Sequence, residues 1–278
     1  MPMADASSHR SLSFRQRLLP LITLSSHVSA PFITTFLLIH LSAPALANVG
    51  GSSLSSQVML LGREYYQTSL AEPYLVLGPL AVHALSGVIR RALIMYPKIK
   101  SPSITNGSTS KPLTFSQRIP GALPTTTLSF TAYTVLLLLP IHLGIHRMLP
   151  QTSTPPILSL GPSELDYSFV QYGLQHWPAR TWAMYAVLVG AAITHAVEGS
   201  RILMGSFGSE SSVKKPSNKN SVVPRNSKKI RRKILAAALA LPVLSGLYVL
   251  YKEPLYLFAD MGRRLEGVYQ LSWIYNTQ

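Results

Sequence analysis

Histidines inside apolar runs are the residues of this sequence whose type and spacing could do chemistry. Two stretches, LAVHALSGVIRR and AITHAVEGSRIL, each place a histidine four residues before a glycine: His83 before Gly87, and His195 before Gly199. Residues four apart share one helix face, and a glycine on that face lets a second helix or a flat ligand approach the backbone. Ionisable residues inside membrane helices are rare and usually functional, so both motifs are candidate sites.

A second histidine lies in the apolar run that precedes each motif. His40 lies in FLLIHL and His142 lies in LLLLPIHL, so the four histidines fall at matched positions of two sequence copies. The chain therefore looks like a duplicated helix pair in which each copy carries two intramembrane histidines. In this arrangement His40 would face His142 near the outer surface, and His83 would face His195 near the inner surface.

Two imidazoles from opposite helices are the axial ligands of a b-type haem. We therefore predict two possible haem b sites, one at His40 and His142 and one at His83 and His195. His146, one turn after His142, could replace it as a ligand. Two alternatives stay open: interhelical hydrogen bonds, each of which stabilises a helix pair by about 0.6 kcal/mol, or another ligand or metal. The layout resembles the five-helix dihaem cytochrome b anchors of fumarate reductases and succinate dehydrogenases.

The elements that must position these histidines are membrane helices. Only 13% of the residues are charged and 47% are hydrophobic, with a mean hydropathy of +0.24, whereas a typical soluble domain has about 25% charged residues. We predict an all-α membrane protein with five transmembrane helices, in which two repeated helix pairs form a four-helix bundle and a fifth helix is added. The expected spans lie within Leu18–Ala47 and at about Tyr74–Tyr96, Leu128–Leu149, Thr181–Met204 and Ile234–Tyr251.

Basic residues sort to one side of the predicted spans. Of the 25 lysines and arginines, 19 fall on the side of the N-terminus, so five crossings satisfy the positive-inside rule and a net charge of +15 needs no nucleic acid to explain it. The resulting organisation is a basic flank (1–17), a first helix pair with an outer loop (18–96), a disordered inside loop (97–127), a second helix pair (128–204), a basic inside loop (205–233), a fifth helix (234–251) and an interfacial tail (252–278). The outer loop, Asn48–Pro73, suits a short interfacial helix or a packed cap.

The remaining charged groups and histidines suggest binding rather than catalysis. We expect Glu198 to pair with Arg201. We expect His27 to have a structural role. His9 and His176 lie outside the predicted spans, and we expect them to have no functional role. We see no catalytic motif, and the absence of cysteine excludes thiol chemistry, so we predict a protein that is not an enzyme. One basic run near the fifth helix could bind anionic lipid headgroups, at about 1 kcal/mol per charge; its members are Lys228, Lys229, Arg231, Arg232 and Lys233.

Three stretches carry a resemblance to one specific family. They are Ser29–Ser53 (SAPFITTFLLIHLSAPALANVGGSS), Leu60–Thr68 (LLGREYYQT) and Glu72–Gly87 (EPYLVLGPLAVHALSG). The chain resembles the fungal mitochondrial adapter proteins of the MDM-complementing type, which are outer-membrane proteins with a duplicated histidine-containing transmembrane domain. The resemblance covers nearly the whole chain from the first span to the tail.

The resemblance implies a role in mitochondrial lipid homeostasis at the outer membrane. It also implies adaptor work, in which the protein recruits a bridge-like lipid-transfer protein of the vacuolar sorting class to organelle contact sites. In that family, recruitment of the lipid-transfer protein is associated with a Pro-x-Pro element in the N-terminal region. This sequence contains no Pro-x-Pro. On this reading the basic side and the N-terminus face the cytosol.

Overall fold

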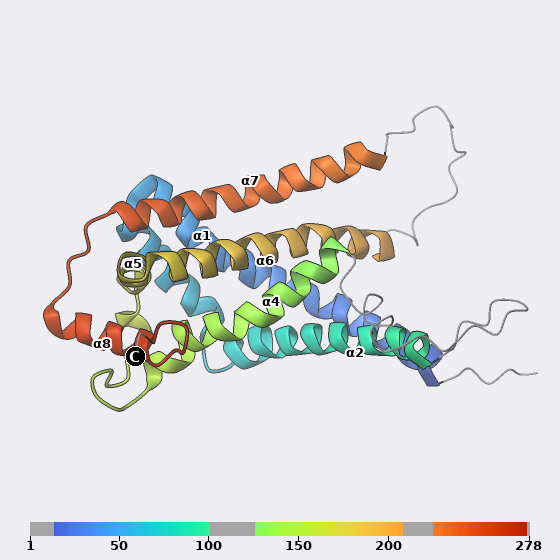
Figure 1. Cartoon of the computed structure of the whole chain (residues 1–278), viewed down its shortest axis with the longest axis horizontal. Coiled ribbons are helices and arrows are strands. Elements are labelled where there is room, and N and C mark those ends of the chain that lie inside the picture. The colour runs from blue at the N-terminus through green and yellow to red at the C-terminus, as the bar shows by residue number, and fades with distance from the viewer. Residues whose placement is uncertain (1–13, 101–125, 208–224, 277–278) are drawn as a thin grey trace, which may run out of the picture. The chain divides into compact units, whose positions relative to one another are not determined.

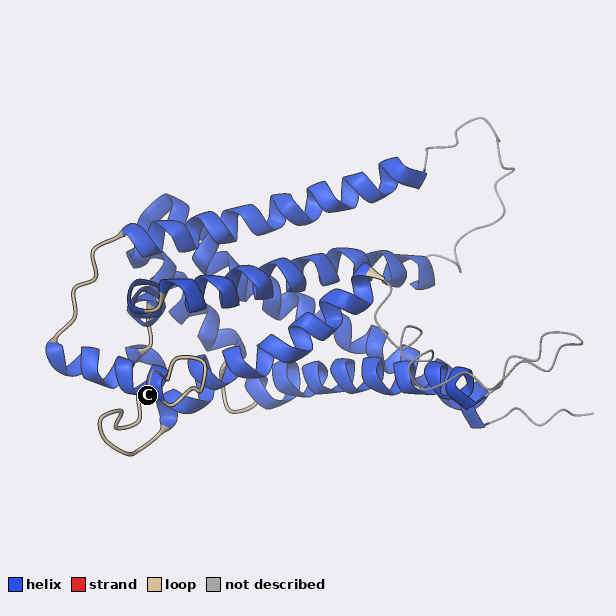
Figure 2. Ribbon diagram, in the orientation of Figure 1, coloured by secondary structure: helices blue, strands red, loops and turns tan. Residues whose placement is uncertain are grey.

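The computed structural model describes residues 14–100, 126–207 and 225–276, and every regular element in these ranges is helical (Figures 1 and 2). In chain order the elements are α1 (Phe14–Tyr66), the π-helical η1 (Glu72–Leu77), α2 (Gly78–Lys100), α4 (Thr127–Leu143), the π-helical η3 (Gly144–Met148), the 3-10 turns η4 (Leu149–Gln151) and η5 (Pro162–Glu164), α5 (Tyr167–His176), α6 (Pro178–Phe207), α7 (Arg225–Lys252) and α8 (Ala259–Gln270).

Five of these helices are long and apolar enough to cross a membrane, which confirms the predicted class of an all-α membrane protein. The five candidate spans are Phe14–Tyr66, Glu72–Met95, Thr127–Gln151, Pro178–Ser206 and Lys229–Lys252. The first helix differs most from the expectation, because it begins at Phe14 and continues through Pro20 and Pro31. A proline costs a membrane helix little where neighbouring groups satisfy the freed carbonyl.

The helices gather into two compact units. The first unit comprises Met1–Ile33 and Glu72–Leu123, and the second comprises Thr34–Ala71 and Pro124–Gln278. The first unit pairs the beginning of α1 with α2. The second unit holds the rest of α1 and every helix from α4 onward, and α6 packs against both α4 and α7 within it. The prediction of one bundle made from both helix pairs stays a prediction.

The predicted outer loop is mostly a helical continuation of α1 beyond a kink. The kink lies at Gly50 and Gly51, and Gly51 has a φ of 60°, which a residue with a side chain rarely adopts. The Glu253 carboxylate accepts a hydrogen bond from the backbone N–H of Ser52 at 2.9 Å, so it caps the helix that restarts there. Because Ser56 then contacts Tyr167, residues 52–66 form a packed cap, one of the two forms expected for this loop.

The second unit ends in a well-packed group of short elements, which we call the outer cap: residues 144–177 and 253–275. Leu265, Val268, Tyr269 and Tyr275 have no exposed surface and pack with the aromatic residues of α5. The apolar face of α8 is therefore buried in protein. The tail, residues 252–278, is predicted to rest on the membrane interface, and this stays a prediction. Four of its described residues build the core named above, whereas Tyr256, Phe258, Leu271 and Trp273 are exposed.

An ion pair at the protein surface links Arg264 of α8 to the turn η5 before α5. Arg264 donates to Glu164 at 2.8 Å, and Glu164 also accepts from the backbone N–H of Gly161 at 2.7 Å. The Gly161 N–H, followed by the Arg264 side chain, lowers the pKa of Glu164 below its usual value.

We therefore expect Glu164→Gln to destabilise the outer cap slightly at neutral pH. A carboxyl group whose pKa is lowered by folding contributes stability above its unfolded pKa and loses that contribution as the pH falls through its folded pKa. The difference in melting temperature between the variant and the wild type should accordingly shrink to nothing in acid. The effect is small because the group is exposed, and a difference that grew on acidification would contradict the assignment.

Candidate functional site

Three histidines of the second unit meet near the end of α6 that adjoins the outer cap. The rings of His40 from α1 and His142 from α4 have centroids 6.0 Å apart and planes that differ by 81°. His146, which sequence analysis offered as a substitute for His142, lies beside it with centroids 4.5 Å apart. The structure thus brings together His40 and His142, as predicted, and adds His146 to the same cluster.

Aromatic side chains surround this cluster. The Tyr185 hydroxyl of α6 and Nε2 of His146 are 3.0 Å apart and share a hydrogen bond. Phe36 stacks on His40 with centroids 5.2 Å apart, and Tyr66 approaches the same ring edge-on at 6.3 Å. Sequence analysis missed these three partners, because an isolated tyrosine or phenylalanine in an apolar run carries no signal of what it faces.

Two ring nitrogens of the cluster have no hydrogen-bond partner among the described residues. Nδ1 of His40 and Nδ1 of His142 are both buried, and no donor or acceptor in that part of the chain lies within reach of either. A buried polar group without a partner costs free energy, and in native proteins it usually marks an ion, a water molecule or a ligand. His146 also lies on the π-helical turn η3, a type of distortion that is frequent at functional sites.

The other two candidate histidines are held by backbone carbonyls. In the first unit, Nδ1 of His83 lies 3.0 Å from the carbonyl oxygen of Ser26, with the hydroxyls of Ser26 and Ser29 at 3.4 and 3.3 Å. In the second unit, Nδ1 of His195 lies 3.3 Å from the carbonyl oxygen of Leu128. A carbonyl can only accept, so each ring carries its proton on Nδ1.

These two contacts give structural support to the predicted duplication. Leu128 follows Ser26 by the same number of positions by which His142 follows His40. Equivalent histidines on α2 and α6 therefore bind equivalent carbonyls on α1 and α4, each inside its own unit. A hydrogen bond from Nδ1 to a carbonyl is also the arrangement that orients Nε2 of a histidine toward a metal.

Within its own unit, neither motif glycine has another described helix packed closely against it. A methyl group built on Gly87 or Gly199 would have no described atom within 4 Å, and the same holds for Gly144 and Gly190. Of the two purposes that the sequence suggested, close approach of a second helix is therefore not found among the described residues of either unit. Space beside these backbones remains for lipid or for a flat ligand.

The centroid separation of His40 and His142 is compatible with two imidazoles on one iron. With metal–nitrogen bonds of about 2 Å, two imidazoles on one iron hold their centroids about 6 Å apart, close to the separation of His40 and His142. His83 and His195 belong to different units, so their pairing stays a prediction. In the described residues no group of three or more histidine or acidic side chains is arranged to hold a metal ion.

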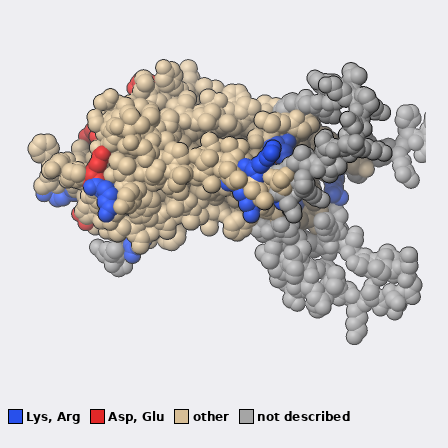
Figure 3. Space-filling view, turned by 90° about the horizontal axis from the view of Figure 1, so that it is seen from above, with Lys and Arg blue, Asp and Glu red and all other residues tan. Residues whose placement is uncertain are grey.

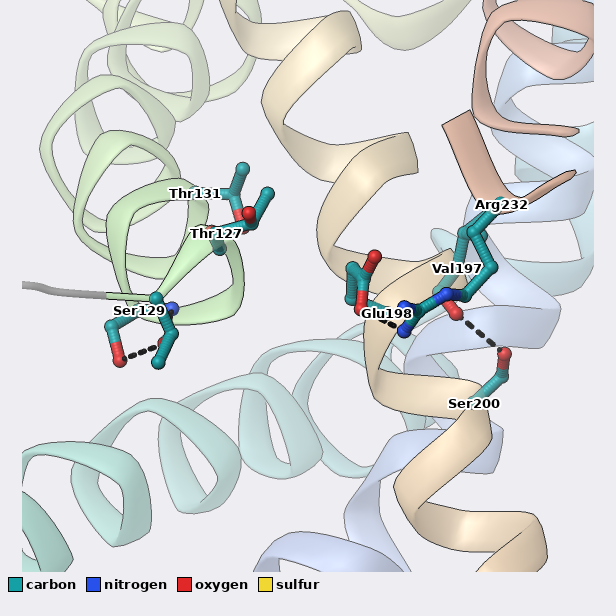
Figure 4. A network of polar contacts seen from close by, with 8 residues as sticks. Thr127, Ser129, Thr131, Val197, Glu198, Ser200 and Arg232 are labelled. Carbon is teal, nitrogen blue, oxygen red and sulfur yellow. Dashed lines mark hydrogen bonds and ion pairs between the residues drawn. The ribbon is translucent and has the colours of Figure 1, made fainter. Parts of the chain in front are cut away.

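Glu198 binds a different arginine from the one expected. Its carboxylate pairs with Arg232 of α7 at 2.6 Å, and both side chains are about four-fifths buried (Figure 4). The predicted partner, Arg201, is exposed. The reason is that α7 begins at Arg225, inside the stretch predicted to be a disordered loop, so its first turns pack beside α6.

Arg232 is one of the residues predicted to bind lipid, and it is paired with Glu198. Lys229, Arg231 and Lys233 of the same set are exposed on α7, and lipid binding by the set stays a prediction. The side chain of Lys228 lies outside the described residues. On the face shown in Figure 3, lysine and arginine side chains flank a broad uncharged surface, as expected where lipid chains contact the protein.

The histidines expected to be incidental or structural lie elsewhere. His176 ends α5, where it stacks on Tyr172 with centroids 3.8 Å apart and contacts the Tyr172 carbonyl. His27 lies near His83 in the first unit. His9 and most of the two predicted inside loops lie outside the described residues.

Comparison with known proteins finds no matching family model, no matching curated protein and no matching solved structure.

Proposed function

We propose that this chain is a non-enzymatic, multi-pass membrane adaptor of the mitochondrial outer membrane that supports lipid homeostasis at organelle contact sites. The observation that carries the proposal is the resemblance of residues 29–53, 60–68 and 72–87 to the mitochondrial adapter proteins described above. On this proposal the chain recruits a bridge-like lipid-transfer protein of the vacuolar sorting class. The given residues contain no Pro-x-Pro element, so recruitment through that motif is not part of the proposal.

Two features of the described residues are compatible with this role. Five apolar helices give a large surface for lipid contact. The exposed Lys229, Arg231 and Lys233 at the start of α7 provide a basic surface for anionic headgroups or for an acidic partner. Both features suit a protein that holds a partner against a membrane.

The proposed orientation is testable by protease protection. We expect the N-terminus and the basic segment 205–233 to face the cytosol, because 19 of 25 basic residues lie on that side. Protease added to intact mitochondria should therefore cut within residues 205–233 and spare the outer cap. Protection of that segment, with digestion of the C-terminus, would reverse the orientation.

The functional test is deletion of the gene in its own host. We expect altered mitochondrial phospholipid composition or an altered number of organelle contacts, with unchanged succinate and fumarate turnover. A second variant carries alanine at Lys229, Arg231 and Lys233. If the basic surface binds the membrane or the partner, this variant should lower the number of organelle contacts. Normal lipids and contacts after deletion, together with lost respiratory turnover, would refute the adaptor.

A second candidate function is that of a dihaem b-type cytochrome membrane anchor. The spacing of His40 and His142 favours it, together with the open space beside Gly87 and Gly199. His40 and His142 would hold one haem b, and His83 and His195 the other. Bound haem would supply one-electron transfer across the bundle. Haem binding is also compatible with adaptor work, in which the group would be structural or sensory.

The purified protein should then show a b-type spectrum in its reduced-minus-oxidised difference. We expect His40→Ala to remove one spectral component and His83→Ala to remove the other. Gly190→Ala serves as a matched control, since a methyl group there meets no described atom within 4 Å. A colourless protein from haem-replete cells, with both histidine variants fully stable, would leave the histidines as helix-packing residues.

A further inference from the structure

The last described turn of the outer cap, Leu271–Ile274, exposes two large apolar side chains. Trp273 is 78% exposed and Leu271 is 54% exposed. The backbone of the turn is nevertheless well held. Ser272 N donates to the Tyr269 carbonyl and Tyr275 N to the Ser272 carbonyl, each at 2.9 Å, and the Tyr275 side chain is fully buried. The indole is therefore presented by a fixed scaffold.

The contacts of this turn place it at the end of a membrane span. Arg180 of α6 donates to the Ile274 carbonyl at 3.0 Å, and the Trp177 ring meets the Tyr275 ring edge-on with centroids 5.5 Å apart. Trp177 and Arg180 flank Pro178, where α6 and its candidate span begin. The exposed Trp273 therefore lies close to the level at which α6 leaves the membrane.

The end of α7 lies at the same level. Gln175, shortly before α6, donates to the Tyr251 and Glu253 carbonyls at 3.3 and 2.9 Å. The Lys252 ammonium lies over the rings of Tyr248 and Tyr251, 5.6 and 5.4 Å from their centroids. Tryptophan and tyrosine gather at the boundary between membrane and water, where lysine and arginine side chains reach toward headgroups. These residues mark such a boundary.

We propose that the turn Leu271–Ile274 is an interfacial anchor that inserts Trp273 and Leu271 among the headgroups and glycerol groups of the adjacent leaflet. The partner is the lipid of the protein's own bilayer. An indole suits this depth because its ring is apolar while its N–H hydrogen-bonds to headgroups or water. The anchor would tie the outer cap to the membrane surface and so hold the ends of α6 and α7 together beneath it.

Tryptophan fluorescence of the full chain in lipid nanodiscs tests this placement. The signal of Trp273 is the difference between the wild type and Trp273→Phe, which keeps the fold because the side chain is exposed; equal melting temperatures of the two proteins verify this. We expect lipids brominated close to the headgroup to quench most of the Trp273 signal, lipids brominated near the bilayer centre to quench it less, and aqueous iodide to quench it weakly.

Two outcomes would overturn the proposal. Strong quenching by iodide without quenching by any brominated lipid would place Trp273 in water. Protection from both quenchers would mean that a protein, either a second copy or another chain, covers the turn.

Discussion

Gly246→Leu is expected to separate α7 from the first helix and to unfold much of the second unit. A Cβ atom built on Gly246 would collide with the backbone carbonyl oxygen of Pro44, which cannot move as a side chain would. Beside this contact the side-chain amide of Asn48 donates to the Pro242 carbonyl at 2.7 Å, so a second contact joins the two helices close to Gly246. Overpacking of this kind costs about 3 kcal/mol.

Thermal unfolding in nanodiscs measures the effect. The melting temperature of Gly246→Leu should fall well below that of the wild type, and protein yield should fall with it. Gly190→Ala is the matched control, since it adds a methyl group to a helix glycine with open surroundings. It should be neutral or stabilise the protein by roughly 0.5 kcal/mol. Equal stability of both variants would show that α7 does not pack on residues 44–48.

Tyr269→Ala is expected to be the most damaging substitution in the outer cap. Tyr269 is fully buried, and its ring lies with centroids 4.7 Å from Phe169, 5.2 Å from Trp177 and 4.9 Å from Tyr275. Deleting a buried aromatic ring costs about 3–5 kcal/mol. Gly173 leaves the room that the Tyr269 phenol occupies, and because it has no side chain it cannot fill the void.

The variant Tyr269→Phe keeps the ring and removes only the hydroxyl, so it measures the contribution of the hydroxyl alone. The hydroxyl donates to the Phe169 carbonyl at 2.9 Å, and losing one buried hydrogen bond costs about 1 kcal/mol. Hydrogen exchange of α8 should therefore rise strongly in Tyr269→Ala and modestly in Tyr269→Phe. Burial raises the pKa of the Tyr269 phenol well above its usual value, so its absorbance should not titrate until the cap unfolds in alkali. Titration at the ordinary pKa in the folded protein would contradict the packing.

The helices were predictable because their signals are local. Apolar runs of sufficient length mark each span, and each predicted boundary of the last four spans lies within a few residues of the observed helix, except that α7 starts earlier at Arg225. The matched histidines also indicated the duplication, because the same residue types recur at nearly the same spacing. The bonds of His83 to Ser26 and of His195 to Leu128 agree with that reading.

The outer cap and the ion pairs were not predictable, because they depend on residues far apart in sequence. Glu198 was assigned to the nearby Arg201, whereas the observed partner, Arg232, comes from another helix. The apolar face of α8 suits a membrane surface and a protein core equally well. Only the packing of α8 against α5 reveals that it builds a core.

The central claim, that the chain recruits a lipid-transfer protein to a membrane, is tested most directly by proximity labelling in intact cells. A biotin ligase fused to the proposed cytosolic N-terminus should label a bridge-like lipid-transfer protein, and a ligase fused to the C-terminus should not. The alanine variant at Lys229, Arg231 and Lys233 reports whether the basic surface contributes. Labelling of respiratory-complex subunits, with no lipid-transfer protein among the products, would contradict the claim.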